Sequence, residues 1–218
     1  LNYNGSGYNT AVGSNAGAAV TTGIKNTILG GLAGDAITTG NSNVALGYSA
    51  LGANTTASNN TAVGVSALAV NTTGTQNVAV GSFSLDAVTT ASNNTAIGYL
   101  SGSAITTGAS NTLLGSTAGD SITTAANNTA VGHASLGAAT TGGSNTAVGY
   151  LSGGLLTTGN SNVAMGYNSL SADTLGDRAV AIGLNALSSQ NFTSSTDNYN
   201  IGIGYAAGTK ITTGVNNT

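Results

Sequence analysis

Apolar, small and polar residues recur in a fixed order every 17 residues along this chain. Each unit opens with a signature of the Asn-Thr-Ala-Val-Gly type, first at 9–13 and then at 26–30, 43–47 and 60–64. The spacing holds to Gly183 and resumes after one longer interval of 21 residues. A short fixed period is typical of a quasi-one-dimensional stack of similar units. We therefore expect a single repeat array over 1–218, of about twelve coils, with a four-residue insertion within 184–199.

Numbered from its Asn, each unit has a pattern that predicts short strands. Position 2 is Thr, Val or Ile, position 3 is usually Ala, position 4 is always Val, Leu, Ile or Met, and position 5 is Gly. Period-two alternation places positions 2 and 4 on one side and positions 3 and 5 on the other. A Thr-Thr pair at positions 13 and 14 indicates a second extended segment, and the residues that follow it form the turn back. The predicted fold class is all-β, a parallel β-roll or β-solenoid with two short strands per coil.

The large apolar residues of position 4 are expected to form one continuous buried column. The members of this column are Val12, Leu29, Leu46, Val63, Val80, Ile97, Leu114, Val131, Val148, Met165, Ile182 and Ile203.

Positions 9 and 12 trade one bulky side chain between them. Six units have Gly at position 9 and a large apolar residue at position 12, as in Gly34 with Ile37. The other six have Leu at position 9, as in Leu51, and five of these lack a large apolar residue at position 12. Because protein cores are packed to near-crystalline density, we expect the two positions to fill one interior slot.

Position 1 and the small positions 3, 5 and 8 also have structural interpretations. The Asn of position 1 either forms a hydrogen-bonded side-chain ladder between coils or is a turn former with left-handed dihedral angles. Positions 3, 5 and 8 are Ala, Gly or Ser almost throughout. Small residues permit the close approach of another backbone, so we expect them at the contacts of a parallel homotrimer.

The composition restricts the function classes. Only 4% of the residues are charged, the formal net charge is -3, and there are three basic residues. Such a chain has no phosphate-binding stripe, so nucleic acid is a poor partner. Its apolar runs are too short to span a bilayer, so we expect no membrane insertion in this segment. The chain begins at Leu1 and stops at the opening of another repeat, so we expect it to be a fragment of a longer protein.

The repeated Asn-Thr-Ala-Val-Gly signature, followed by a small residue and a Gly-closed turn, resembles the head repeats of YadA-like trimeric adhesins. It also resembles repeat arrays of bacterial and phage fibre proteins. The resemblance extends from Asn9 over nearly the whole chain. It implies three parallel chains, each coiled as a left-handed β-roll around a common axis. The usual adhesin repeat is shorter, and this stretch has no stalk, anchor or fibre-chaperone domain.

Few residues are candidates for direct contact with a ligand. Most share position 6, where exposed rings would offer stacking surfaces for glycans. The possible surface contacts are Tyr48, Tyr99, His133, Tyr150, Tyr167, Tyr205 and, in the insertion, Phe192. His133 is interpreted as a substitute for Tyr.

The insertion is expected to emerge as a surface excursion within 191–199, as a local contact site or a plain bulge, without breaking the stack. Asp173, Asp177 and Arg178 are interpreted as a solvated charged turn. Asp35, Asp86 and Asp120 share position 10 but lie two or three coils apart, which is too far for shared metal coordination.

No nucleophile–base pair, phosphate loop or metal cage is evident. The chain is therefore interpreted as non-enzymatic, with no catalytic, cofactor-binding or metal-binding residue. The favoured function is a structural and adhesive fibre segment, such as part of an adhesin or tail fibre, that is extracellular and located on a cell surface or virion. Its partners would be two further copies of the chain and a glycan or other host-surface receptor. The alternatives are an extracellular filament subunit and an ice- or crystal-surface-binding solenoid that uses the Thr-Thr column. Strand alternation weakens the last alternative, because it lets only one Thr of each pair face outward.

Overall fold

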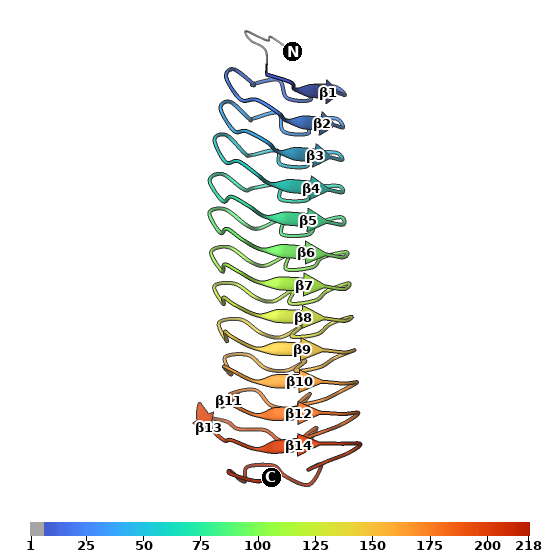
Figure 1. Cartoon of the computed structure of the whole chain (residues 1–218), viewed down its shortest axis with the longest axis vertical. Coiled ribbons are helices and arrows are strands. Elements are labelled where there is room, and N and C mark those ends of the chain that lie inside the picture. Colours follow the sequence, from blue (N-terminus) through green and yellow to red (C-terminus); the bar gives the residue numbers. More distant parts are fainter. Residues whose placement is uncertain (1–6) are drawn as a thin grey trace.

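A computed structural model describes residues 7–218, which form a solenoid of stacked coils (Figure 1). One short strand from each coil joins a single 12-stranded parallel sheet, in chain order from β1 to β14. The strands of this sheet are β1 (Thr10–Val12), β2 (Thr27–Leu29), β3 (Val44–Leu46), β4 (Thr61–Val63), β5 (Val78–Val80), β6 (Thr95–Ile97), β7 (Thr112–Leu114), β8 (Thr129–Val131), β9 (Thr146–Val148), β10 (Val163–Met165), β12 (Val180–Ile182) and β14 (Ile201–Ile203). The predicted all-β parallel solenoid with a 17-residue period is therefore confirmed.

Each coil contributes one regular strand to the stack, and not two. The Thr-Thr segments are bends, although their backbone still bonds from coil to coil, as from the Thr21 N–H to the Thr38 carbonyl at 3.0 Å. A second sheet occurs only near the C-terminal end, where β11 (Gly176–Asp177) pairs in parallel with β13 (Thr196–Asp197). The expectation of a regular second strand in every coil is wrong, because the bend turns both Thr side chains outward.

Glycine at position 5 ends each strand of the main sheet because no other residue fits there. Gly98 has a φ of +142°, and a Cβ added to it would lie 2.3 Å from the carbonyl oxygen of Gly115 in the next coil. Backbone conformations of this kind are essentially restricted to glycine, and the close approach excludes any side chain.

Position 3, and not position 4, faces the interior. Residues such as Ala45 and Ala96 are fully buried, whereas Leu46 and Ile97 beside them are 38% and 42% exposed. The predicted column of buried position-4 residues is therefore wrong, although the alternation itself holds. The interior is narrow and already filled from the opposite wall, so the inward strand position takes a small residue and the large one points outward.

The interior slot shared by positions 9 and 12 is confirmed. A Cβ added to Gly34 would lie 2.8 Å from Cδ1 of Ile37, and one added to Gly153 would lie 3.1 Å from Cδ1 of Leu156. Leu51, which represents the other type of coil, is fully buried at position 9. In every coil but one, a single bulky apolar side chain fills the slot; the exception holds both Leu85 and Val88.

The Asn residues of position 1 form a buried ladder. The backbone N–H of Asn77 donates to Oδ1 of Asn60 at 3.0 Å, and Nδ2 of Asn60 donates to the Gly74 carbonyl at 2.9 Å. The same pair of bonds repeats along the stack, as where Asn94 accepts from the Asn111 N–H at 2.9 Å. Left-handed backbone occurs instead at the residue before each Asn, as at Asn59 and Asn93. Of the two interpretations of position 1, the ladder is the one observed.

The small residues of positions 3 and 8 line the interior of their own chain. Ala96 and Ser101 have no exposed surface. The expectation that they lie at contacts between chains is wrong, since a second backbone cannot reach them. Their small size is explained by the narrow coil in which they face the slot side chain.

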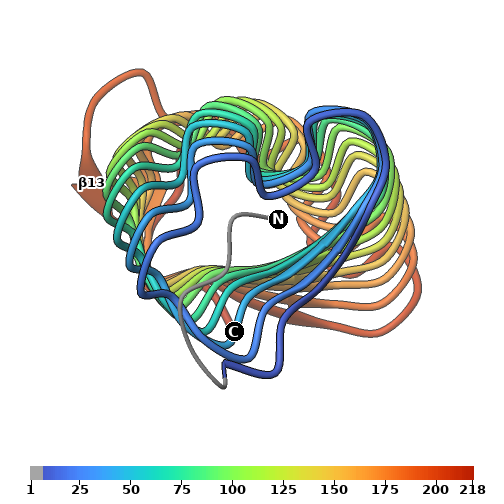
Figure 2. The ribbon, with the colours of Figure 1, turned by 90° about the horizontal axis from the view of Figure 1, so that it is seen from above.

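The insertion leaves the stack as an excursion on the outside of the coil, as predicted. Figure 2 shows it projecting beyond the outline of the other coils, with β13 on its returning arm. Beneath it, β12 and β14 pair in the usual register, with Val180 opposite Ile201.

Candidate binding surfaces

The outward face of the main sheet is an uncharged surface of aliphatic residues and threonine. Position 4 supplies an aliphatic column, with Val12 57% and Ile203 66% exposed at its ends. Position 2 supplies a second column of Thr, Val and Ile beside it, and neither position carries a charged residue in any unit. Contiguous apolar surface of this kind is typical of a face that contacts another molecule.

An aromatic column runs beside this sheet at position 6. Five tyrosines in the column are exposed, as expected: Tyr48, Tyr99, Tyr150, Tyr167 and Tyr205. His133 is also exposed and occupies the same place in its coil, which agrees with its interpretation as a substitute for Tyr.

Three consecutive rings of the column stack on one another. His133 and Tyr150 have ring centroids 5.4 Å apart with an interplanar angle of 13°, and Tyr150 and Tyr167 follow at 5.3 Å and 10°. Because the faces of Tyr150 are covered by its neighbours, a sugar ring cannot lie flat on it. Tyr150 therefore presents its ring edge and polar tip, and His133 and Tyr167 each have a stacking partner on one face.

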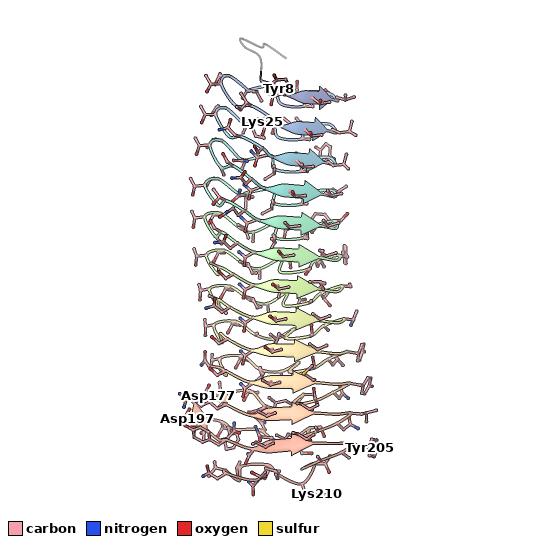
Figure 3. All side chains as sticks on the ribbon, in the orientation of Figure 1. Tyr8, Lys25, Asp177, Asp197, Tyr205 and Lys210 are labelled. Atoms are coloured by element: carbon pink, nitrogen blue, oxygen red, sulfur yellow. The ribbon has the colours of Figure 1, made fainter. Side chains whose placement is uncertain are left out.

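Other members of the column have freer surroundings. Tyr205 is 80% exposed and points away from the rod, on the side opposite Asp177 and Asp197 (Figure 3). Tyr48 lies beside Gly31, which has no side chain to cover it. Tyr99 and Phe83 pack edge to face, with their ring centroids 6.5 Å apart. The predicted surface contact Phe192 is only 5% exposed, so it anchors the excursion and does not offer a surface.

The Thr-Thr segments form two adjacent columns with different roles. Hydroxyls at position 13 donate to carbonyls of the next coil, as from Thr72 to Thr89 at 3.0 Å. Position 14 residues such as Thr73 and Thr107 are exposed. The expectation that one Thr of each pair faces inward is wrong, because both lie outside the coil at the bend.

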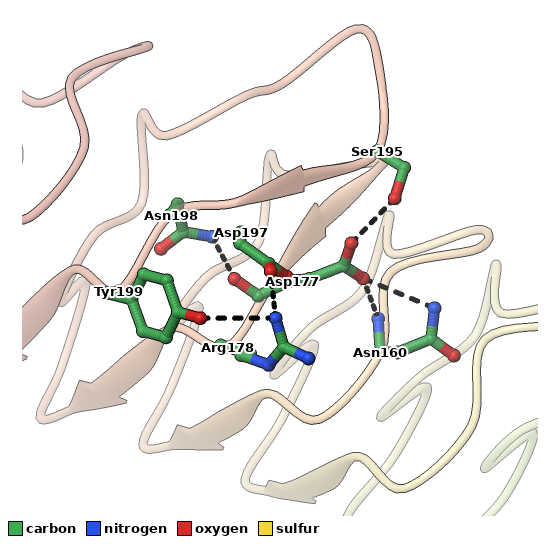
Figure 4. A network of polar contacts seen from close by, with 7 residues as sticks. All are labelled: Asn160, Asp177, Arg178, Ser195, Asp197, Asn198 and Tyr199. Carbon is green, nitrogen blue, oxygen red and sulfur yellow. Dashed lines mark hydrogen bonds and ion pairs between the residues drawn. The ribbon is translucent and has the colours of Figure 1, made fainter.

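The excursion gathers a charged and polar cluster (Figure 4). Arg178 forms an ion pair with Asp197, and its guanidinium carbon lies 5.7 Å from the ring centroid of Tyr199. The Asp197 carboxylate raises the pKa of Arg178 further above its ordinary value. Asp177 is 8% exposed and accepts hydrogen bonds from the Asn160 N–H at 2.6 Å and the Ser195 hydroxyl at 2.7 Å.

The expectation of a solvated charged turn is therefore only partly met. Arg178 is exposed, but Asp177 is buried beneath the excursion, and Asp173 lies inside the coil with no exposed surface. Asp173 accepts a hydrogen bond from Nε2 of Gln190 at 2.6 Å and another from the Phe192 N–H at 3.1 Å. It thereby ties the start of the excursion to the core. The sequence does not predict the burial of Asp173, because it does not show that position 12 points inward when it is polar. It does not predict the burial of Asp177, at position 16, because that depends on the path of the excursion.

The aspartates of position 10 stay apart. No group of three or more His or Asp side chains in residues 7–218 is arranged to hold a metal ion. Burial raises the pKa of Asp86 and of Asp120 above the ordinary value of 3.8, and the nearby charge of His133 partly opposes this at Asp120. Oδ1 of Asp86 is buried without a hydrogen-bond partner among the described residues.

No family model, curated protein or solved structure matches this chain. Residues 7–218 contain no helix that is long and apolar enough to cross a membrane.

Proposed function

We propose that this chain is a structural and adhesive segment of an extracellular fibre, a stiff rod on a cell surface or virion. The observation that carries the proposal is the uninterrupted bonding between coils. Each step from one coil to the next repeats strand pairing and, with one substitution near the excursion, the buried Asn ladder. A stack bonded at every step resists bending and local opening. At about 4.8 Å per coil, twelve coils give a rod roughly 55 Å long.

The rod is proposed to be a parallel homotrimer whose chains meet through the outward face of the main sheet. That face is apolar and uncharged, and it repeats with the period of the chain itself. A parallel copy in register would therefore meet the same pair of columns at every coil. This arrangement agrees with the trimeric, left-handed architecture implied by the resemblance to YadA-like head repeats. In this trimer the chains meet through positions 2 and 4, and not through the small residues of positions 3 and 8 as the sequence predicts.

The aromatic column is the proposed contact surface for a host-surface receptor or glycan. Tyr48, Tyr99 and Tyr205 offer the most accessible rings, while His133, Tyr150 and Tyr167 offer a stacked edge. Exposed aromatic rings with a polar tip are favoured at contact surfaces. No such role requires a catalytic residue, a metal or a cofactor.

Small-angle X-ray scattering of the purified chain tests the rod. The proposal predicts a particle with one long dimension of roughly 55–60 Å and the cross-section of three chains. A cross-section that corresponds to one chain would contradict the trimer, and end-to-end growth at rising concentration would favour the filament alternative. Binding of the labelled protein to a glycan array, compared with a Tyr205→Ser variant, tests the adhesive part.

A second candidate function is binding to ice or another ordered surface through the Thr columns. It is favoured by the exposure of the position-14 threonines at coil spacing, as at Thr73 and Thr107. Thermal hysteresis of the purified protein tests it, and Thr107→Lys should abolish the activity if this surface meets ice. A freezing point equal to that of an unrelated protein at the same concentration would exclude this function.

A further inference from the structure

The excursion and the side of the stack form a small cavity that is open to solvent. The cavity has a volume of about 140 Å³ and is lined by Asn160, Ser161, Asp177, Arg178 and Asp197. That volume is several times the roughly 30 Å³ share of one water molecule, so it accommodates one small ring-sized group. Every lining residue is polar or charged, in a chain in which only 4% of residues are charged.

The walls of the cavity are fixed. On the β13 side, Asn198 donates from its backbone N–H and from Nδ2 to the Asp177 carbonyl, at 3.1 and 2.7 Å. At the start of the excursion, the Thr174 hydroxyl donates to the Phe192 carbonyl at 2.9 Å. Because both arms are bonded to the stack, the polar groups are held in place before any ligand arrives, which lowers the entropic cost of binding.

Several lining groups retain hydrogen-bonding capacity. Arg178 uses Nη1 for both Asp197 and Tyr199, and it makes no bond through Nη2 or Nε to the described residues. A guanidinium carries five N–H donors, so most of its donors are free. Asp197 uses Oδ2 for the ion pair, which leaves Oδ1 as an acceptor, and the Ser161 hydroxyl has no partner within residues 7–218.

The charges of the cluster select against ionic ligands. Two carboxylates, those of Asp177 and Asp197, would repel an anion. A metal ion would have to approach the guanidinium of Arg178, which is already paired with Asp197. Adjacent hydroxyl groups on a neutral molecule meet neither obstacle, because each hydroxyl both accepts from a donor such as Arg178 and donates to an acceptor such as Asp197. The half-exposed ring of Tyr199 lies beside the guanidinium and helps to position it.

We infer that this cavity binds a neutral saccharide unit through its vicinal hydroxyl groups. The inference names a ligand for the adhesive function proposed above, and rests on that function for its biological setting. It places the sugar on the opposite side of the rod from the aromatic column (Figure 3). Arg178 donates to one hydroxyl, Oδ1 of Asp197 accepts from its neighbour, and Ser161 lies beside them.

Lys25 provides a matched control for Arg178. Both are exposed basic residues at the last position of their units, and both have left-handed backbone. Among residues 7–218, no insertion follows the unit of Lys25. Replacing either residue with Gln removes one positive charge from an equivalent place in the coil. Only the Arg178→Gln variant alters the cavity.

The test is NMR titration of the labelled protein with glucose, galactose, mannose and N-acetylglucosamine, read at the side-chain N–H of Arg178. At least one sugar should shift this signal, with a dissociation constant on the order of millimolar. Arg178→Gln should weaken binding of that sugar by about tenfold or more, measured by saturation transfer, and Lys25→Gln should leave it unchanged. Ser161→Ala, which touches none of the bonds that anchor the excursion, should also weaken it.

Three outcomes would overturn the inference. They are the absence of any sugar-dependent shift in the parent protein, equal binding by Arg178→Gln, and a response to inorganic phosphate or calcium without a response to sugars. Sedimentation of the same samples reports the assembly separately, so a trimer that binds no sugar refutes this site and leaves the proposed rod intact.

Discussion

Oδ1 of Asn198 accepts the backbone N–H of Asn200 at 2.9 Å. In the regular coils this N–H bonds to the position-1 Asn of the preceding coil, but here that position is Ala179, which has no side-chain amide. Asn198, on the returning arm of the excursion, thus provides the hydrogen-bond acceptor that Ala179 cannot provide. This compensation explains how the stack continues past an irregular coil.

Removal of this acceptor should therefore destabilise the C-terminal coils. Asn198→Ala leaves the N–H of buried Asn200 without its acceptor, at a cost of about 1–3 kcal/mol. Chemical denaturation measures the loss, and Thr193→Ala on the same excursion is the control. Adding Ala179→Asn to the Asn198→Ala variant should recover part of the stability, because it restores the regular ladder. If Asn198→Ala is as stable as the control, this role of Asn198 is wrong.

Loss of an Asn from the ladder of the regular coils should also destabilise the fold. Asn94→Ala removes the acceptor of the Asn111 N–H and the donor to the Gly108 carbonyl, both in buried surroundings. We expect a loss of about 1–3 kcal/mol for each buried group left unpaired. Thr107→Ala, on the exposed surface of the same unit, should change the free energy of unfolding by less than about 0.5 kcal/mol. Equal effects of the two substitutions would contradict the ladder.

The shared slot predicts strong coupling between Gly153 and Leu156. Gly153→Leu should overpack the coil by about 1–3 kcal/mol, and Leu156→Ala should leave a cavity that costs about 2–5 kcal/mol. The double variant reproduces the natural combination of Leu136 and Ala139 in the preceding coil, so it should be more stable than the sum of the single changes predicts. A double-mutant cycle that shows simple additivity would refute the slot.

The buried carboxyl of Asp86 predicts a pH dependence. Its pKa is raised in the folded state, so the folded chain holds this proton more tightly than the unfolded chain does. The contribution of this carboxyl group to the stability of the folded chain is therefore fully present below pH 3.8, its ordinary pKa. This stability is lost as the pH rises through the raised pKa of the folded state. Asp86→Asn should be more stable than the parent at neutral pH, with a difference that shrinks as the pH falls below about 4. Thermal melts across this range test the sign, and Asp120→Asn should change in the same direction.

Much of the fold follows from the sequence because the repeat constrains it at every coil. The period predicts the solenoid, the exchange between positions 9 and 12 predicts the slot, and the interval before Gly204 predicts the excursion. The predicted inward face of the strand is wrong because large size does not indicate burial in this coil. In a narrow coil the inward position takes a small residue, and the large one is left outside.

The sequence nevertheless contains a signal that position 3 of the strand faces the interior. Position 3 is large only at Ile28 and Leu113, and each of these lies in the second of two consecutive units with Gly at position 9. A Cβ added to Gly17 would lie 2.9 Å from Cδ1 of Ile28, and one added to Gly119 would lie 2.9 Å from Cδ2 of Leu113. Position 3 is thus part of the same exchange of volume as positions 9 and 12. The cavity under the excursion had no such signal, because it depends on an irregular path of the chain.

A substitution at position 4 distinguishes the folding of one chain from the association of chains. Ile97 is 42% exposed on the outward sheet face, so Ile97→Asp should leave the single-chain coil folded while placing a charge in the proposed contact between chains. Circular dichroism should change little, and the assembly should weaken. Loss of the folded signal in the dissociated variant would show that the coil depends on its partners.

The mass of the chain in solution tests the central claim most directly. Sedimentation analysis should give an elongated species with three times the 20.8 kDa mass of one chain, and Ile97→Asp should shift it toward the single-chain mass. A stable, folded species of 20.8 kDa for the parent protein at all concentrations would contradict the trimeric rod and favour a single-chain solenoid.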